Sequence, residues 1–185
     1  MKRIVLTCGL IAGGFLAAMM AWMVPLCMEG HVDMTTSAIF GYTTMVVAFL
    51  AVFFGVRSYR DKTGDGTITF VKAFQVGILI TLVACAIYVA TWEIIYFNFL
   101  PDFADKYAAL SLAKMRAAGA SAAEIVKAEK EMADFKRLYP NPLFNIGMTL
   151  MEVFPVGLIV TLVSAAILRR KATPGIGPAT TAAVS

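Results

Sequence analysis

The sequence predicts an all-α integral membrane protein: a bundle of four transmembrane helices with an external amphipathic helical hairpin between the third and the fourth. Apolar residues make up 59% of the 185-residue chain and charged residues only 15%, a balance outside the range of a soluble core. The apolar residues gather in four stretches that approach or exceed the ~20 residues a helix needs to cross a bilayer. Because backbone groups in a bilayer must bond within their own segment, these stretches are expected to be helices.

The first span is predicted over residues 4–26, directly behind the basic pair Lys2 and Arg3. Such a start also resembles a secretory signal peptide. The apolar run is longer than the ~7 to 15 residues of a usual signal core, and it contains no convincing cleavage site. We therefore expect this segment to be retained as a membrane helix.

The second and third spans are separated by a basic loop that contains two glycines. The second span is predicted over residues 34–56, and it ends at Arg57 and Arg60. The third is predicted over residues 70–100. It is longer than a bilayer core requires, so it should tilt or project beyond the membrane.

The fourth span is predicted over residues 143–168, and it stops at Arg169 and Arg170. Residues 1–171 are expected to form a single transmembrane domain. A tail rich in Pro, Gly, Ala and Thr follows over residues 172–185, and its composition predicts disorder.

Clusters of Lys and Arg set the expected orientation. They flank the amino end, the loop after the second span and the carboxyl end, whereas residues 27–33 contain neither. The positive-inside rule therefore predicts a bacterial inner-membrane protein with both termini in the cytoplasm and Arg57, Arg60, Arg169 and Arg170 as basic anchors. Since the net charge of +4 comes from these flanks, the predicted partner is the lipid bilayer and not nucleic acid.

The external helical hairpin is predicted over residues 102–139. Gly119 interrupts it, and Ser121 with Glu124 forms a capping box that begins the second helix. Apolar residues then recur at spacings of three and four: Ile125, Ala128, Met132, Phe135 and Tyr139. This stripe is expected either to pack on the hairpin and the span ends, or to dock a partner or the outer leaflet.

Small residues are expected to hold the spans together, because lipid offers apolar side chains no reason to leave it. They form ridges at helical spacing: Gly9, Gly13, Ala17 and Ala21 on the first span, Ala73, Gly77 and Thr81 on the third, and Gly157, Thr161 and Ala165 on the fourth. These ridges predict one closely packed bundle.

The candidate polar site in the membrane comprises Glu93 and Glu152, with Trp92, Tyr88 and Pro155 beside them. A carboxyl group inside a bilayer is costly, so its presence is a functional hypothesis by default. Both glutamates are predicted in the outer half of the membrane, where a shared pocket would let them hold one proton or bind a cation. Pro155 removes a backbone donor within a turn of Glu152 and is expected to kink the fourth span.

A structural interpretation of the same glutamates stays open. In it, Glu93 lies in the aromatic belt at the outer interface and is simply solvated. Glu152 then makes a hydrogen bond to a polar group on another helix, with no transport.

Two short patterns resemble metal sites. Residues 61–72 partly match a calcium-binding loop, but Lys72 stands where calcium requires a bidentate glutamate. Four potential ligands alternate before the second span: Cys27, Glu29, His31 and Asp33. Short loops are polar for solvation alone, and no cofactor motif or nucleophile with an adjacent base is visible. We therefore expect no metal, no cofactor and no catalytic residue.

A set of motifs is spread over nearly the whole chain apart from its tail: Gly41-Tyr42, Phe53–Asp61, Ile68–Phe74 with Gly77, Tyr88, Trp92-Glu93, Pro101–Tyr107, Asn141–Phe144 and Glu152–Gly157. Together these motifs resemble the bacterial domain-of-unknown-function family 4199. The resemblance implies a multi-span helical membrane protein and carries no assigned activity.

Two functions are compatible with this sequence. The first is a non-enzymatic transport-accessory, sensing or assembly role, as a homo-oligomer or with another membrane protein. The alternative is a small proton- or cation-coupled transporter that uses Glu93 and Glu152. The sequence does not identify a ligand for either function.

Overall fold

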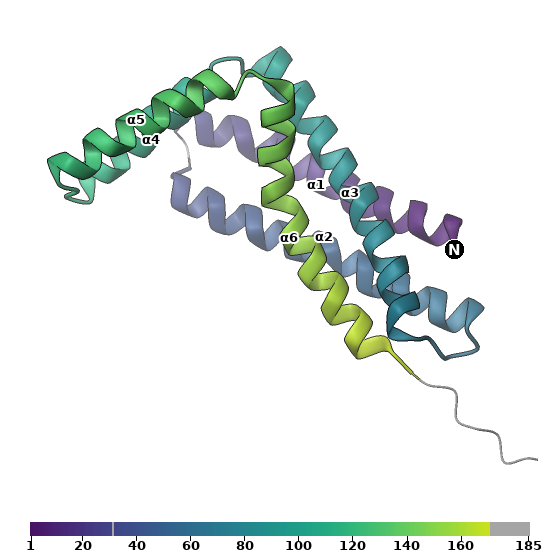
Figure 1. The fold of residues 1–185 in the computed structure, drawn as a ribbon. Helices are drawn as coiled ribbons and strands as arrows, with labels where there is room; N and C mark the ends of the chain where they lie inside the picture. Colours follow the sequence, from purple (N-terminus) through teal and green to yellow (C-terminus); the bar gives the residue numbers. More distant parts are fainter. Residues whose placement is uncertain (31, 171–185) are drawn as a thin grey trace, which may run out of the picture.

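The structure, a computed structural model, describes residues 1–30 and 32–170. In this part of the chain it contains no strand and six α-helices: α1 Lys2–Met28, α2 Met34–Thr63, α3 Phe70–Phe99, α4 Phe103–Ala117, α5 Ala122–Leu138 and α6 Pro142–Leu168 (Figure 1). His31 and the tail for which the sequence predicts disorder lie outside the described residues.

Four helices, α1, α2, α3 and α6, are long and apolar enough to cross a membrane. The predicted all-helical class is therefore confirmed, and the bounds of α1, α3 and α6 differ from the predicted spans by at most two residues. In contrast, α2 continues to Thr63, well past the predicted end. Hydropathy marks where an apolar stretch stops, but the helix goes on through polar residues, where Asp61 pairs with Arg60 at 2.7 Å.

Large apolar side chains cover the outside of these four helices. Among the most exposed are Trp22 at 62%, Ile94 at 59%, Met151 at 75% and Ile167 at 65%. A soluble protein rarely leaves so much continuous apolar surface uncovered. These faces are suited to contact with the lipid bilayer.

Glycines bring α1 close to α3, as the ridge on the first span predicts. A Cβ atom added at Gly9 would lie 2.6 Å from the side chain of Val83, and one added at Gly13 would lie 2.7 Å from Ile87. The prediction holds only for this half of α1, since Ala21 is exposed.

The contact between α3 and α6 also depends on small residues. Gly77 and Gly157 are buried, and the hydroxyl groups of Thr81 and Thr161 lie 2.9 Å apart between the two helices. Figure 1 shows that α6 changes direction about midway along its length, where Pro155 interrupts the backbone hydrogen bonding.

The α4 and α5 helices run back along each other between α3 and α6 (Figure 1). The capping box of Ser121 and Glu124 begins α5 as predicted. Ion pairs join the two helices, with Arg116 at 2.7 Å from Glu129. The ring of Phe135, on the apolar stripe of α5, lies 5.6 Å from that of Tyr107 on α4. Because α4 covers this part of the stripe, it is not a free surface for a partner.

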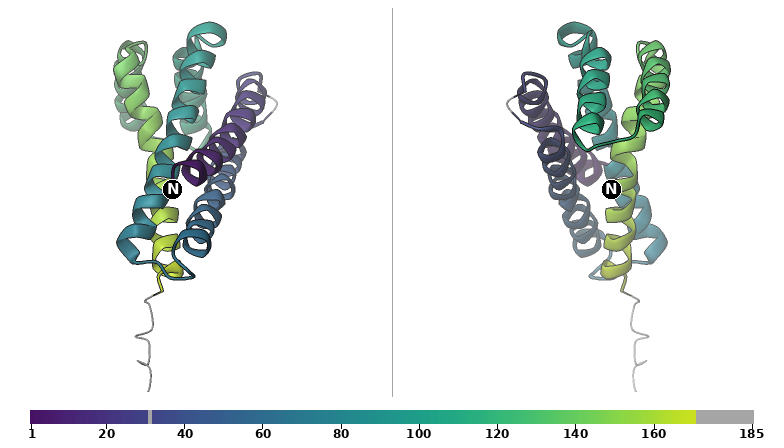
Figure 2. Two further views of the ribbon diagram at one scale, coloured as in Figure 1. Left: turned by 90° about the vertical axis from the view of Figure 1, so that its right-hand side faces the viewer. Right: turned by 90° about the vertical axis from the view of Figure 1, so that its left-hand side faces the viewer.

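The opposite end of the bundle carries Lys2, Arg3, Arg57, Arg60, Arg169 and Arg170, and we call it the basic end. There the loop after α2 lies beside the carboxyl end of α6, with Ile68 and Arg170 exchanging two backbone hydrogen bonds of 3.1 and 2.9 Å. Thr69 caps α3. From this end, the α1–α2 pair and the α3–α6 pair lean apart toward α4 and α5 (Figure 2).

Candidate functional site

Two adjoining cavities lie between the helices, on the side of the bundle nearest α4 and α5. The larger has a volume of about 500 Å³ and the smaller about 140 Å³. Residues from all four long helices line both spaces: Met20, Val24, Ser37, Tyr88 and Glu152. We call the two spaces together the bundle cavity.

The larger space takes lining residues from all four long helices and from α4 and α5. Its lining is rich in aromatic rings: Tyr42, Tyr88, Trp92, Phe103, Tyr107, Phe135 and Tyr139. Flexible thioethers from Met20, Met28 and Met148 fill other parts of the wall. Among the described residues, this lining contains no Lys, Arg or Asp, and Glu152 is its one acidic residue.

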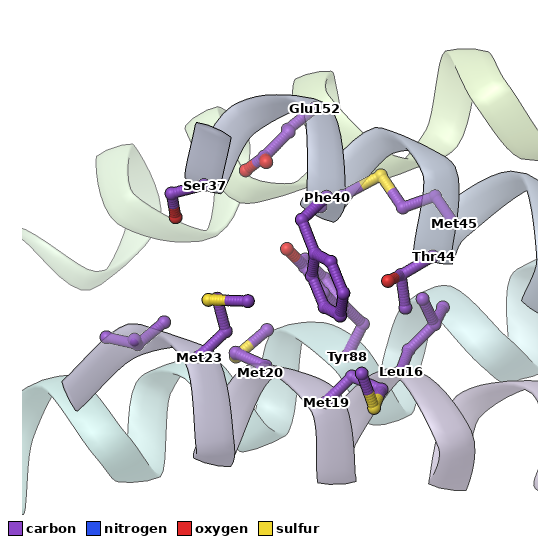
Figure 3. A pocket seen from close by; sticks show the side chains of 12 residues that line it. Leu16, Met19, Met20, Met23, Ser37, Phe40, Thr44, Met45, Tyr88 and Glu152 are labelled. Atoms are coloured by element: carbon purple, nitrogen blue, oxygen red, sulfur yellow. The ribbon is translucent and has the colours of Figure 1, made fainter. Parts of the chain in front are cut away.

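Glu152 enters the bundle cavity from α6, three residues before Pro155. Figure 3 shows its carboxylate and the Tyr88 hydroxyl both pointing into the smaller space, opposite the thioethers of Met20 and Met23. The side chain remains accessible because it faces this space. Among the ion pairs of the described residues, none involves Glu152.

An ionised carboxylate without a cationic neighbour is costly in an apolar interior. Glu152 can remove this cost in two ways, by holding a proton or by pairing with a cation that enters the cavity. The arrangement is therefore suited to exchange a proton for a positively charged ligand.

Trp92 is fixed at the wall of the cavity by a buried hydrogen-bond network. Its indole N–H donates to the Asn145 side-chain oxygen at 2.8 Å and to the Tyr139 hydroxyl at 3.0 Å. The Thr149 hydroxyl donates to the backbone oxygen of Asn145 at 2.9 Å. Burial raises the pKa of the Tyr139 hydroxyl, so it stays neutral while accepting from Trp92. The network joins α3 to the start of α6.

Edge-on and tilted rings extend this network into α4 and α5. The Trp92 ring lies 4.8 Å from Phe103, and Tyr139 lies 4.6 Å from Phe135 and 5.2 Å from Tyr96. Aromatic pairs at these separations attract each other beyond their apolar burial. The rings therefore attach α4 and α5 to the bundle as one side of the cavity.

Asn145→Ala is expected to lower the free energy of unfolding by about 1–3 kcal/mol, because Asn145 is fully buried and supplies an acceptor to Trp92. Thermal unfolding in detergent measures the change. Asn98→Ala is the matched control, since that exposed amide donates only to its own helix and its loss should cost less than ~0.5 kcal/mol. Equal effects of the two substitutions would contradict the structural role of the network.

Glu93 does not join Glu152 in the bundle cavity, because it is absent from the lining of both described spaces. It lies on the stripe of α3 that carries the exposed residues Ala86, Ala90 and Phe97. One of its carboxylate oxygens is nevertheless inaccessible and has no hydrogen-bond partner among the described residues. The hypothesis of two carboxyls in one pocket therefore finds no support in this geometry.

Comparison with protein families yields a match to the family model described as "Protein of unknown function (DUF4199)", over residues 7–170. The chain belongs to this family. The resemblance drawn from the sequence motifs is thus confirmed, and the family description assigns no activity. A comparison with curated proteins and one with solved structures found no match.

The basic anchors of this DUF4199 chain lie far from the bundle cavity. From Glu152 to Arg169 the α6 helix rises by roughly 25 Å at ~1.5 Å per residue. Arg57 and Arg60 both pair with Asp61, at 3.8 and 2.7 Å. The structure thus brings Tyr88, Trp92 and Glu152 together, with Pro155 one turn away, and it separates these residues from the four arginines.

Sequence reasoning did not assign several polar residues to the cavity or its wall. Thr149 lines the larger space and Asn145 is buried behind Trp92; both are polar residues inside an apolar span, and their cost in a bilayer was a usable signal. Ser37 carried no such signal because it lies near the start of a helix, and Tyr139 was assigned only to the apolar stripe of the hairpin. The fold shows that Ser37, Tyr139 and Thr149 face one cavity.

Proposed function

We propose that this chain is a small, non-enzymatic transporter of the bacterial inner membrane in which Glu152 binds a proton or a cation. The observation that carries the proposal is the Glu152 carboxylate, directed into a cavity between the spans and without an ion-pair partner among the described residues (Figure 3). A non-enzymatic role is favoured because the sequence offers no nucleophile with an adjacent base and no cofactor motif.

A closed core supports a transport role. Toward the basic end the cavity stops at tightly packed side chains that have no exposed surface, among them Phe49, Val52, Val76 and Ile80. A site with a cavity on one side and a packed core on the other is what one state of an alternating-access cycle requires. Transport would need this core to open while the cavity closes.

The distribution of charge supports an orientation with the cavity toward the outside. Lys2, Arg3, Arg57 and Arg60 begin or end spans on the same side as Arg169 and Arg170. By the positive-inside rule this side of the protein faces the cytoplasm, and both termini lie on the same side. The α4–α5 pair then forms an external hairpin, and the multi-pass topology has four spans.

Proteoliposomes provide the test of this function. With a pH-sensitive dye inside and a gradient of Na⁺, K⁺ or a membrane-impermeant organic cation across the membrane, the wild-type protein is expected to move protons faster than empty liposomes under at least one of these gradients. Glu152→Gln should reduce the flux to the level of empty liposomes, because an amide neither releases a proton nor pairs with a cation.

Glu93→Gln is the matched control, since Glu93 lies outside the bundle cavity, and it should retain the wild-type flux. If Glu152→Gln carries the same flux as the wild type, the transport role of Glu152 is wrong. If Glu93→Gln alone abolishes the flux, the proton path runs along the other face of α3.

A further inference from the structure

The charge of the bundle cavity is unusual for its size. In about 500 Å³ the larger space contains one carboxylate and no Lys, Arg or Asp among its described lining residues. Three of the basic residues of α4 and α5 are engaged elsewhere: Lys114 donates to Thr35, Lys136 pairs with Asp105, and Arg116 pairs with Glu129. The cavity therefore attracts a positive charge and repels a negative one.

The wall of the larger space selects the kind of cation. Seven of its lining residues are aromatic, and the face of an aromatic ring attracts a cation whose charge is poorly hydrated. Methionines add polarizable, flexible surface that adapts to different shapes. Such a wall is favourable for an organic cation and unfavourable for a strongly hydrated inorganic one.

A metal ion fits this space poorly. Sodium, magnesium and calcium need several oxygen ligands that converge within about 2.0–2.6 Å, and a single carboxylate in a wide cavity does not supply them. Among the described residues, no group of three or more His, Cys, Asp or Glu side chains is placed to hold a metal ion. The volume instead suits a molecule of drug-like size.

We propose that the bundle cavity binds a monovalent organic cation with aromatic or alkyl substituents, its charge near the Glu152 carboxylate and its substituents against the rings that surround Trp92. This inference rests on the proposed function in that the organic cation is the cargo. Binding displaces the proton from the Glu152 carboxyl group to solvent, so the cavity exchanges one positive charge for another.

The pH dependence of this exchange follows from the groups that face Glu152. Apart from Glu152 on α6, the titratable side chains among the described residues of the cavity wall are Cys27 from α1, Tyr42 from α2, Tyr88 from α3, Tyr107 from α4 and Tyr139 at the end of α5. All are neutral in their protonated form, so none replaces the cation as a partner for Glu152. Lowering the pH therefore weakens binding through protonation of this carboxylate.

Tetraphenylphosphonium is a suitable probe, with the anion tetraphenylborate as a control of nearly the same shape. The chain has two tryptophans, and Trp22 is 62% exposed on the outside of α1. Trp22→Phe therefore leaves Trp92, in the cavity wall, as the reporter. The full-length protein in detergent is titrated with each probe while Trp92 fluorescence is recorded. The dissociation constant for tetraphenylphosphonium is expected to be at least about 10-fold lower than that for tetraphenylborate.

Glu152→Gln in the same background is expected to weaken tetraphenylphosphonium binding at least about 10-fold, whereas Glu93→Gln leaves it unchanged. Should Glu152→Gln fail to fold, the pH dependence of the protein that retains Glu152 provides the test. Its affinity for tetraphenylphosphonium must fall as the pH is lowered from 8 to 5. Equal binding of the two probes, or binding that depends on neither Glu152 nor pH, would overturn the proposal.

The liposome assay separates this result from the proposed function. If Glu152-dependent proton flux persists while tetraphenylphosphonium fails to bind, the class of cargo is wrong and transport stands. If the probe binds at Glu152 but no proton flux occurs under any of the gradients, including that of the organic cation, the cation site stands and the chain binds its ligand without transporting it.

Discussion

Gly157→Leu is expected to destabilise the bundle by about 3 kcal/mol or more, because the new side chain has no room between the helices. A Cβ atom at Gly157 would already lie 2.5 Å from Thr81 and 2.8 Å from the ring of Phe49. These neighbours belong to α3 and α2, so a larger side chain forces apart three helices at once. Thermal unfolding of the purified protein in detergent measures the loss.

Gly147→Leu is the matched control on the same helix. A Cβ atom there meets nothing within 4 Å, so the substitution should leave the unfolding temperature within a few degrees of the wild type. Similar losses at both positions would mean that α6 does not pack on α2 and α3 through Gly157.

Phe49→Ala is expected to cost at least about 2 kcal/mol of stability and to open the closed core below the cavity. Phe49 has no exposed surface, and its ring fills the space beside Gly157 between α2 and α6. Because lipid is as apolar as the protein interior, the cost comes from lost packing contacts more than from transfer out of water. Unfolding temperature and passive ion leak through liposomes measure the two effects.

Phe54→Ala removes the same ring from the same helix, but at a position that is 59% exposed on the outside of the bundle. It should change neither stability nor leak. The double substitution Phe49→Ala with Gly157→Leu should be less harmful than the sum of the two, because removing the ring makes room for the new side chain. Strict additivity would contradict the direct contact between the two positions.

Apolar length and composition predicted the number and position of the four long helices, because a bilayer dictates the minimum length of an apolar helix. Short sequence motifs also predicted structure correctly where the interacting residues are close in sequence, as at the capping box of Ser121 and Glu124 that begins α5. The small residues Gly9, Gly13, Gly77 and Gly157 marked the helix contacts correctly, since close approach of two backbones tolerates little else.

The same sequence did not predict which side of each helix faces the cavity. Helices that contact lipid on one side and protein on the other are apolar all round, so periodicity carries little information about rotation. For this reason Glu93 and Glu152 looked equivalent, although only Glu152 lines the cavity. The network of Trp92, Tyr139 and Asn145 joins residues distant in sequence, and no local pattern predicts such contacts.

Access to position 152 tests the central claim most directly, namely that Glu152 faces a cavity open toward α4 and α5 and closed toward the basic end. Glu152→Cys, in a variant whose three native cysteines are replaced by alanine, is treated with a membrane-impermeant, positively charged thiol reagent. We expect rapid modification in right-side-out membranes and none in inverted vesicles. Modification from the cytoplasmic side alone, or from neither side of a folded protein, would contradict this account of the cavity.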